Sequence, residues 1–262
     1  MSLGKFMGEA DAYGEHPGSF NTTHWSVVLA AGQEHSAFAN EALEMLCRSY
    51  WYPIYAFVRR RGHDAHQAED LTQGFFEFLL ERKGLATVDP QKGRFRSFLL
   101  AVLANFLNNE HDKAQALKRG GRRDIISWDE LEPEERYRLE PVEEFSADRL
   151  FERRWAFTLV ERALERLRLE YRQNGREALY TQLQPCLTAE IEPGQYAIIA
   201  ARLGLSEGAV KTALHRLRRQ FGELLRREVA RTVANPREIE GEIRDLFTII
   251  AADPTLDAPS TL

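Results

Sequence analysis

The chain has 262 residues, of which 44% are hydrophobic and 29% charged, with 15 Phe, 8 Tyr and 4 Trp. This composition excludes a chain that is disordered overall and supplies enough apolar side chains for sizeable cores. No apolar run approaches the roughly 18 residues of a membrane span, and the first 20 residues have no apolar stretch typical of a signal peptide. Two cysteines without a CxxC pair exclude a disulfide framework. We therefore expect a folded cytoplasmic protein without membrane contact.

The net charge of −5 conceals a segmented pattern. Residues 92–123 carry eight Lys or Arg against two acids, and residues 202–231 carry eight against three. Between these basic blocks, residues 129–148 carry nine acids against two Arg, and the chain from residue 237 onward has six acids against two Arg. The signs alternate, which indicates two basic regions separated by an acidic one.

The first half of the chain is predicted to be helical, because apolar residues recur every three or four positions and do not alternate as in strands. We expect helices over 23–32, 36–62, 64–84 and 95–112. Pro53 should kink or break the second of these helices, and Asp64 with Gln67 forms a capping box at the start of the third. The fourth is strongly apolar and leads into a basic run, KRGGRR.

The second half is predicted to be a separate helical domain. Residues 124–150 are rich in acids, contain two prolines and show few core-type spacings, so we interpret them as a linker that either screens the basic domains or folds against one of them. After helices over 155–171 and 178–183, two apolar stripes flank Gly204, and Ser206 caps the second. Ala200 is small enough for two helices to cross, and Gly204 tolerates a positive φ. The pattern predicts a helix–turn–helix.

The solvent face of the helix after Ser206 is rich in hydrogen-bond donors suited to base edges and phosphates in a major groove. Its members are Lys211, Thr212, His215, Arg216 and Arg219. An ordinary solvated helical hairpin with surplus arginines is the alternative interpretation.

The segment AEDLTQGFF at 68–76 carries a resemblance once it is read with the apolar helix, the basic run and the helix–turn–helix that follow it. Over about 40–123 and 155–230 the chain resembles a bacterial RNA polymerase sigma factor of the extracytoplasmic-function type. The resemblance implies that Glu69, Asp70 and Gln73 bind core polymerase.

The segment from Phe95 to Lys113 is similar to the helix pair with which this family opens and reads the −10 promoter element. Asn105 falls where the family commonly has Asn, whereas Asn109 and Asp112 depart from the usual Asp and Arg. Phosphate-facing charge for this role is provided by Arg94, Arg96, Lys113, Lys118 and Arg119. The helix–turn–helix looks like the family's reader of the −35 element.

The resemblance implies a non-enzymatic, two-domain protein that needs no cofactor and no metal. Its parts would be an N-terminal tail (1–23), a polymerase-binding and −10 domain (24–123), the acidic linker (124–150), a −35 domain (151–232) and a helical extension (233–262). Implied partners are core RNA polymerase, through its clamp and flap, and promoter DNA, with room for an anti-sigma factor or another regulator. The amphipathic extension is expected to pack on the second domain.

Two other function classes compete with this interpretation. His63 and His66 stand one helical turn apart, as metal ligands can, but no other cluster completes a shell and HExxH, P-loop and GxSxG patterns are missing. The stronger rival is a helix–turn–helix regulator that binds operator DNA without polymerase. A structural adaptor without a DNA role fits the two basic blocks poorly.

Overall fold

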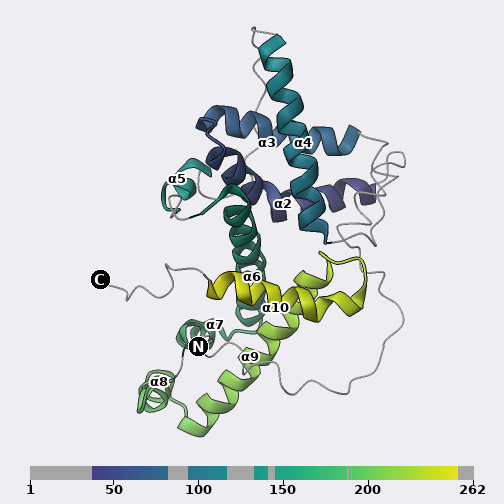
Figure 1. The fold of residues 1–262 in the computed structure, drawn as a ribbon. Helices are drawn as coiled ribbons and strands as arrows, with labels where there is room; N and C mark the ends of the chain where they lie inside the picture. The colour runs from purple at the N-terminus through teal and green to yellow at the C-terminus, as the bar shows by residue number, and fades with distance from the viewer. Residues whose placement is uncertain are drawn as a thin grey trace. The chain divides into compact units, whose positions relative to one another are not determined.

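A computed structural model of the chain describes residues 37–81, 94–116, 133–140, 145–187, 189 and 191–252. Every regular element in these residues is a helix, which confirms the all-α prediction (Figure 1). None of these helices combines the length and hydropathy that crossing a membrane requires. The α-helices are α2 (Ala37–Arg60), α3 (Ala65–Glu81), α4 (Phe95–Ala116), α5 (Pro133–Arg138), α6 (Ala147–Gln173), α7 (Glu177–Leu183), α8 (Gln195–Leu203), α9 (Glu207–Ala230) and α10 (Ile239–Ala251), with short 3₁₀ helices at Gln184–Cys186 and Pro236–Glu238. The helix expected over 23–32 lies outside the described residues.

The chain divides into two compact units. Unit 1 contains residues 159–228, and unit 2 contains the described residues up to 158 and from 229 onward. The chain therefore passes from unit 2 into unit 1 within α6 and returns to unit 2 within α9. The division falls inside helices, whereas the sequence placed it in the acidic segment 124–150.

Helix α2 is the centre of unit 2. All residues from 49 to 58 are buried, so this stretch is covered on every side of the helix and not only along one stripe. Pro53 lies inside α2 without ending it, contrary to a break. Proline removes one backbone hydrogen bond, but here the residues before and after it are held by the core around them.

Aromatic side chains join α2 to its neighbours. Trp51 stacks on Phe76 of α3 with ring centroids 5.8 Å apart, and Tyr50 lies 5.5 Å from Phe95 of α4 and 6.3 Å from Phe151 of α6. Aromatic contacts at these distances add to the stability that burial supplies. Residues 50 and 51 thus fix three helices around one.

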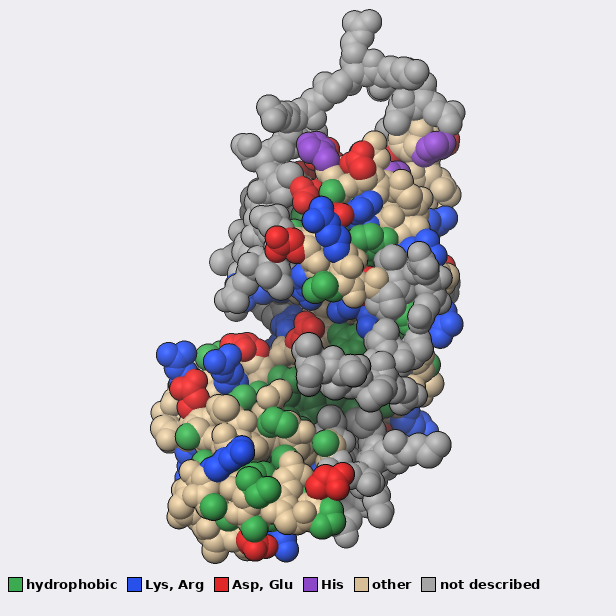
Figure 2. Space-filling view, turned by 90° about the vertical axis from the view of Figure 1, so that its left-hand side faces the viewer, with side chains coloured by type: hydrophobic (Ala, Val, Ile, Leu, Met, Phe, Trp, Pro, Cys, Tyr) green, Lys and Arg blue, Asp and Glu red, His purple; other side chains and the backbone are tan. Residues whose placement is uncertain are grey.

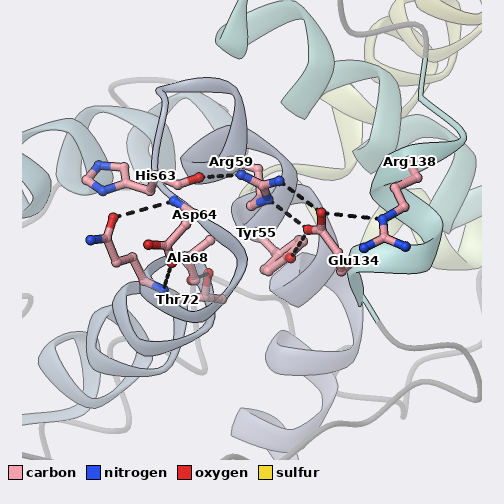
Figure 3. A network of polar contacts seen from close by, with 9 residues as sticks. Tyr55, Arg59, His63, Asp64, Ala68, Thr72, Glu134 and Arg138 are labelled. Carbon is pink, nitrogen blue, oxygen red and sulfur yellow. Dashed lines mark hydrogen bonds and ion pairs between the residues drawn. The ribbon is translucent and has the colours of Figure 1, made fainter.

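Part of the acidic segment is folded against α2. Arg59 of α2 donates from Nε and Nη2 to the two carboxylate oxygens of Glu134 of α5, at 2.8 and 2.9 Å, and Tyr55 Oη donates to the same carboxylate at 2.7 Å. Figure 3 shows Arg59 lying between this carboxylate and the carbonyl of His63. Hydrogen bonds from Arg59, followed by the bond from Tyr55, lower the pKa of Glu134, against the opposing effect of burial.

Glu140, two residues after the end of α5, is held more deeply. The Glu140 side chain is fully buried and accepts hydrogen bonds from Tyr52 Oη and Arg153 Nη1, both at 2.7 Å, and it also pairs with Arg154. Burial, then the charge of Glu140, raises the pKa of Tyr52. The acidic segment was expected either to screen the basic domains or to fold against one of them. Its residues 133–140 fold against α2 and α6.

Unit 1 is held together by contacts between α6 and α9. Tyr171 Oη donates to Gln220 Oε1 at 3.0 Å, and Arg162 Nε lies 3.2 Å from Glu228 Oε2. Arg218 of α9 donates through Nη2 to the carbonyl of Cys186 at 2.7 Å, which fastens the segment after α7 to α9. These contacts orient α9 within its unit.

Candidate nucleic-acid and partner interfaces

Helices α8 and α9 are joined by a short turn that contains the C-cap of α8 and the N-cap of α9. Gly204 has φ +64° and its N–H donates to the carbonyl of Ala200, while the N–H of Leu205 donates to the same carbonyl at 2.9 Å. Ser206 Oγ accepts from the N–H of Ala209 at 3.2 Å. The predicted roles of Gly204 as the left-handed residue and of Ser206 as the N-cap are confirmed.

The predicted DNA-reading residues all lie exposed on α9, and we call them the α9 face: Lys211, Thr212, His215, Arg216 and Arg219. Buried Val210, Leu214 and Leu217 occupy the opposite side of the helix. This separation places apolar side chains inward and donors outward, as a helix that enters a groove requires.

Three side chains of the α9 face make contacts with neighbouring residues. Lys211 Nζ lies 5.1 Å from the centroid of the Tyr196 ring of α8, a cation–π contact. Thr212 Oγ1 donates back to the carbonyl of Gly208 at 2.9 Å, and Arg219 lies 3.8 Å from Glu223. Because these side chains are exposed, the contacts are weak enough to exchange for a nucleic-acid ligand.

A pocket of about 110 Å³ lies between the end of α6 and α9. Its lining residues are Glu170, Tyr171, Asn174, Arg176, Arg216, Arg219 and Gln220. Two members of the α9 face thus share a pocket with Arg176, which the sequence did not single out. The Asn174–Gly175 pair before it is a turn signal that, read with the arginine, points to this position.

On α3, the predicted capping box is present. The N–H of Gln67 donates to Asp64 Oδ1 at 2.8 Å, and the reciprocal bond to Gln67 Oε1 is 3.4 Å. The buried face is formed by Ala68, Thr72, Phe75, Phe76 and Leu79, with Leu71 and Phe78 half-buried beside it.

The predicted polymerase-binding residues lie along the other side of α3. The Asp70 side chain is 42% exposed and lies 3.1 Å from His66 Nδ1, whereas Glu69 and Gln73 are half-buried. Gln73 Nε2 donates to Glu77 Oε1 at 3.1 Å. Among the residues described, no three His, Cys, Asp or Glu side chains gather in a way that could hold a metal ion.

Helix α4 holds the residues predicted for the −10 element. Asn105 is exposed, Phe98 is half-buried, and Phe95 is fully buried in the core. Lys113 lies within the last turns of α4. Lys118 and Arg119 fall outside the residues that the structure describes.

Arg94 and Arg96 are engaged by α10. Arg94 Nε lies 3.1 Å from Glu242 Oε2, and Arg94 also pairs with Asp245. Arg96 is buried, with its side chain 4% exposed, and it pairs with Glu242 while its guanidinium lies 4.4 Å from the Trp155 ring centroid. In this structure Arg96 therefore does not face solvent as a phosphate contact would.

The C-terminal extension accordingly belongs to unit 2, not to the second domain on which it was expected to pack. Its buried residues are Glu242, Ile243 and Leu246. In the sequence, Glu242 lies within the apolar stripe of α10, and this position indicates a buried carboxylate that needs a cationic partner such as Arg96. Burial raises the pKa of Glu242, and the charge of Arg96 opposes that rise.

The candidate surfaces on α9, α3 and α4 therefore differ in how far their charged side chains are exposed to solvent. On the face drawn in Figure 2, acidic and basic side chains are interspersed, so no single sign covers it. The α9 face concentrates donors, α3 presents Asp70, and Arg94 with Arg96 meets carboxylates of α10.

No family model matches the chain, and neither the curated proteins nor the solved structures contain a match.

Proposed function

We propose that the chain is a sigma factor of the extracytoplasmic-function type, which binds core RNA polymerase and directs initiation at specific promoters. The observation that carries the proposal is the α9 face: five donor-bearing side chains exposed on one helix that follows a glycine turn and a serine cap. Such a helix fits a major groove, where donors distinguish base pairs.

The α9 face divides into two functions along the helix. Lys211, Thr212 and His215 lie near its start and are placed for base edges of the −35 element. Arg216 and Arg219 lie further along and are placed for phosphates, which hold the protein in register without reading sequence. This division makes the two groups separable by mutation.

Binding to polymerase is assigned to α3. Asp70 is exposed and its pair with His66 is a surface contact worth at most about 1 kcal/mol, so a partner can displace it at little cost. Glu69 and Gln73 flank it on the same helix. These residues stand in the AEDLTQGFF segment, which resembles the family's polymerase-binding helix.

Contact with the −10 element is assigned to the exposed side of α4, where Asn105 offers an amide to an unstacked base. Phe95 is a core residue, so aromatic capture of a base falls to half-buried Phe98. Arg96 supports this part of the proposal least, because it is buried in an ion pair.

Purified protein should bind bacterial core polymerase in a pull-down and support run-off transcription from a genomic library. Asp70→Arg should lose core binding while keeping its circular dichroism spectrum. Glu165→Arg, an exposed charge reversal on α6, is the matched control and should bind as the parent does.

Each outcome decides between functions. Equal competition for core by Asp70→Arg and the parent contradicts the assignment of α3. Sequence-specific duplex binding without any core binding indicates a stand-alone regulator and overturns the proposed function.

A further inference from the structure

The pocket between α6 and α9 is a basic site outside the helix–turn–helix pattern. Three of its lining residues are arginines and one is a glutamate, which gives a local charge of +2. Among the described residues, neither Arg176 nor Arg216 forms an ion pair. Within the part of the chain that the structure describes, the ion pair of Arg219 is the exposed contact to Glu223 at 3.8 Å. The guanidinium groups are therefore available to an anionic ligand.

The chain positions Arg176 by backbone geometry. Helix α6 ends at Gln173. Two residues later Gly175 has φ +65°, and its N–H donates to the carbonyl of Arg172 at 3.0 Å. The N–H of Arg176 then donates to the carbonyl of Tyr171 at 2.8 Å. These two bonds turn the chain tightly at the end of α6 and bring Arg176 back beside it.

The same turn is fastened to α9. Tyr171 Oη donates to Gln220 Oε1 at 3.0 Å, and Gln220 neighbours Arg219 in the chain. Tyr171, Arg176 and Arg216 line the same small pocket, and the charges of the two arginines lower the pKa of Tyr171 against the larger effect of burial. Arg176 and Arg216 therefore converge on one place although they are 40 residues apart.

We propose that Arg176, Arg216 and Arg219 form a site for one phosphodiester of the DNA backbone, so that Arg176 extends the DNA contact of α9 onto the α6–α7 turn. Guanidinium groups match phosphate oxygens with paired donors, and three of them around a small pocket outweigh the repulsion from Glu170. The inference rests on the proposed DNA binding by α9 and adds a residue from outside the helix–turn–helix.

The test needs no promoter sequence, because a phosphate contact acts on any duplex. Binding of the full chain to a random 30-base-pair duplex is measured by fluorescence anisotropy between about 50 and 200 mM salt. Arg176→Ala should reduce the slope of log K against log salt by about 0.9, which makes its affinity about 3.5-fold less salt-sensitive over this range. Arg176→Lys should restore most of the slope.

Arg172→Ala is the matched control, because Arg172 is exposed on α6 close to the turn but does not line the pocket. It should keep the parental slope. A second arm titrates inorganic phosphate and follows thermal unfolding. Phosphate should stabilise the parent more than Arg176→Ala if the pocket also takes free phosphate, and a DNA-only site is shown by a slope change without that difference.

An Arg176→Ala slope equal to that of Arg172→Ala, with folding intact by circular dichroism, overturns the site while leaving the proposed function in place. A lowered slope in a protein that supports no transcription with core polymerase overturns the proposed function and leaves the site. A parent that binds no duplex overturns both.

Discussion

Removing the buried carboxylate of α10 should destabilise unit 2. The Glu242 side chain is 1% exposed and lies against Arg96, whose side chain is 4% exposed. Glu242→Ala leaves the Arg96 charge buried without its main partner, a change that typically costs about 3–5 kcal/mol. Asp245 at 3.6 Å and Glu152 at 3.8 Å still face Arg96, so we expect the lower end, about 3 kcal/mol.

Tryptophan fluorescence is the appropriate measurement, because Trp51 and Trp155 are both buried in the part of unit 2 that the structure describes. In urea, a loss of about 3 kcal/mol at a slope of roughly 2 kcal/mol/M lowers the midpoint by about 1.5 M. Glu240→Ala makes the same chemical change at an exposed position of α10 and should shift the midpoint by less than about 0.5 M.

A double variant separates the ion pair from a general packing defect. Arg96→Met with Glu242→Leu replaces both charges by apolar groups and should recover at least half of the loss, since well-packed apolar pairs often equal buried ion pairs. If the double variant loses as much stability as the two single variants added together, or if Glu242→Ala matches Glu240→Ala, the Arg96–Glu242 pair does not hold α10 in place.

Three further outcomes follow from local features. The lowered pKa of Glu134 means that its contribution to stability is present above the ordinary value of 4.5 and disappears as pH falls through the lowered one, so the difference in urea midpoint between the parent and Glu134→Gln should vanish in acid. Gly204→Ala should cost about 1–2 kcal/mol because φ is +64°, whereas Gly208→Ala should be neutral or stabilising. No atom lies within 4 Å of the Cβ that either substitution adds, so thermal unfolding of the two variants compares the backbone effect alone. Lys211→Ala should flatten the preference among single-base variants of a −35 duplex and Arg219→Ala should weaken all of them alike; if both scale every affinity by one factor, the helix supplies charge without reading sequence.

Features set by neighbouring residues were predictable from the sequence. The capping box of Asp64 and Gln67 spans three residues, and Gly204 with Ser206 marks a turn within three, so the residue types alone specify the geometry. The α9 face was predictable for the same reason, because helical periodicity decides which side chains point outward once the buried stripe is known.

Features that depend on distant partners were not predictable. A helix with Pro53 inside it requires knowledge of the core around α2, and the fold of residues 133–140 depends on Arg59 and the arginines of α6. Arg96 carries a charge that suits either phosphate or carboxylate, and only the structure shows that Glu242, 146 residues later, is its partner.

That separation has a consequence for synthesis on the ribosome. The described residues up to 158 emerge before those of unit 1, yet the unit to which they belong is completed by α10 near the end of the described chain. At typical elongation rates of about 5–20 residues per second, Arg96 waits roughly 7–30 s before Glu242 is made. During that interval the arginine stays hydrated and the apolar surface that α10 covers stays open, so the first-made unit is the last to reach its final packing.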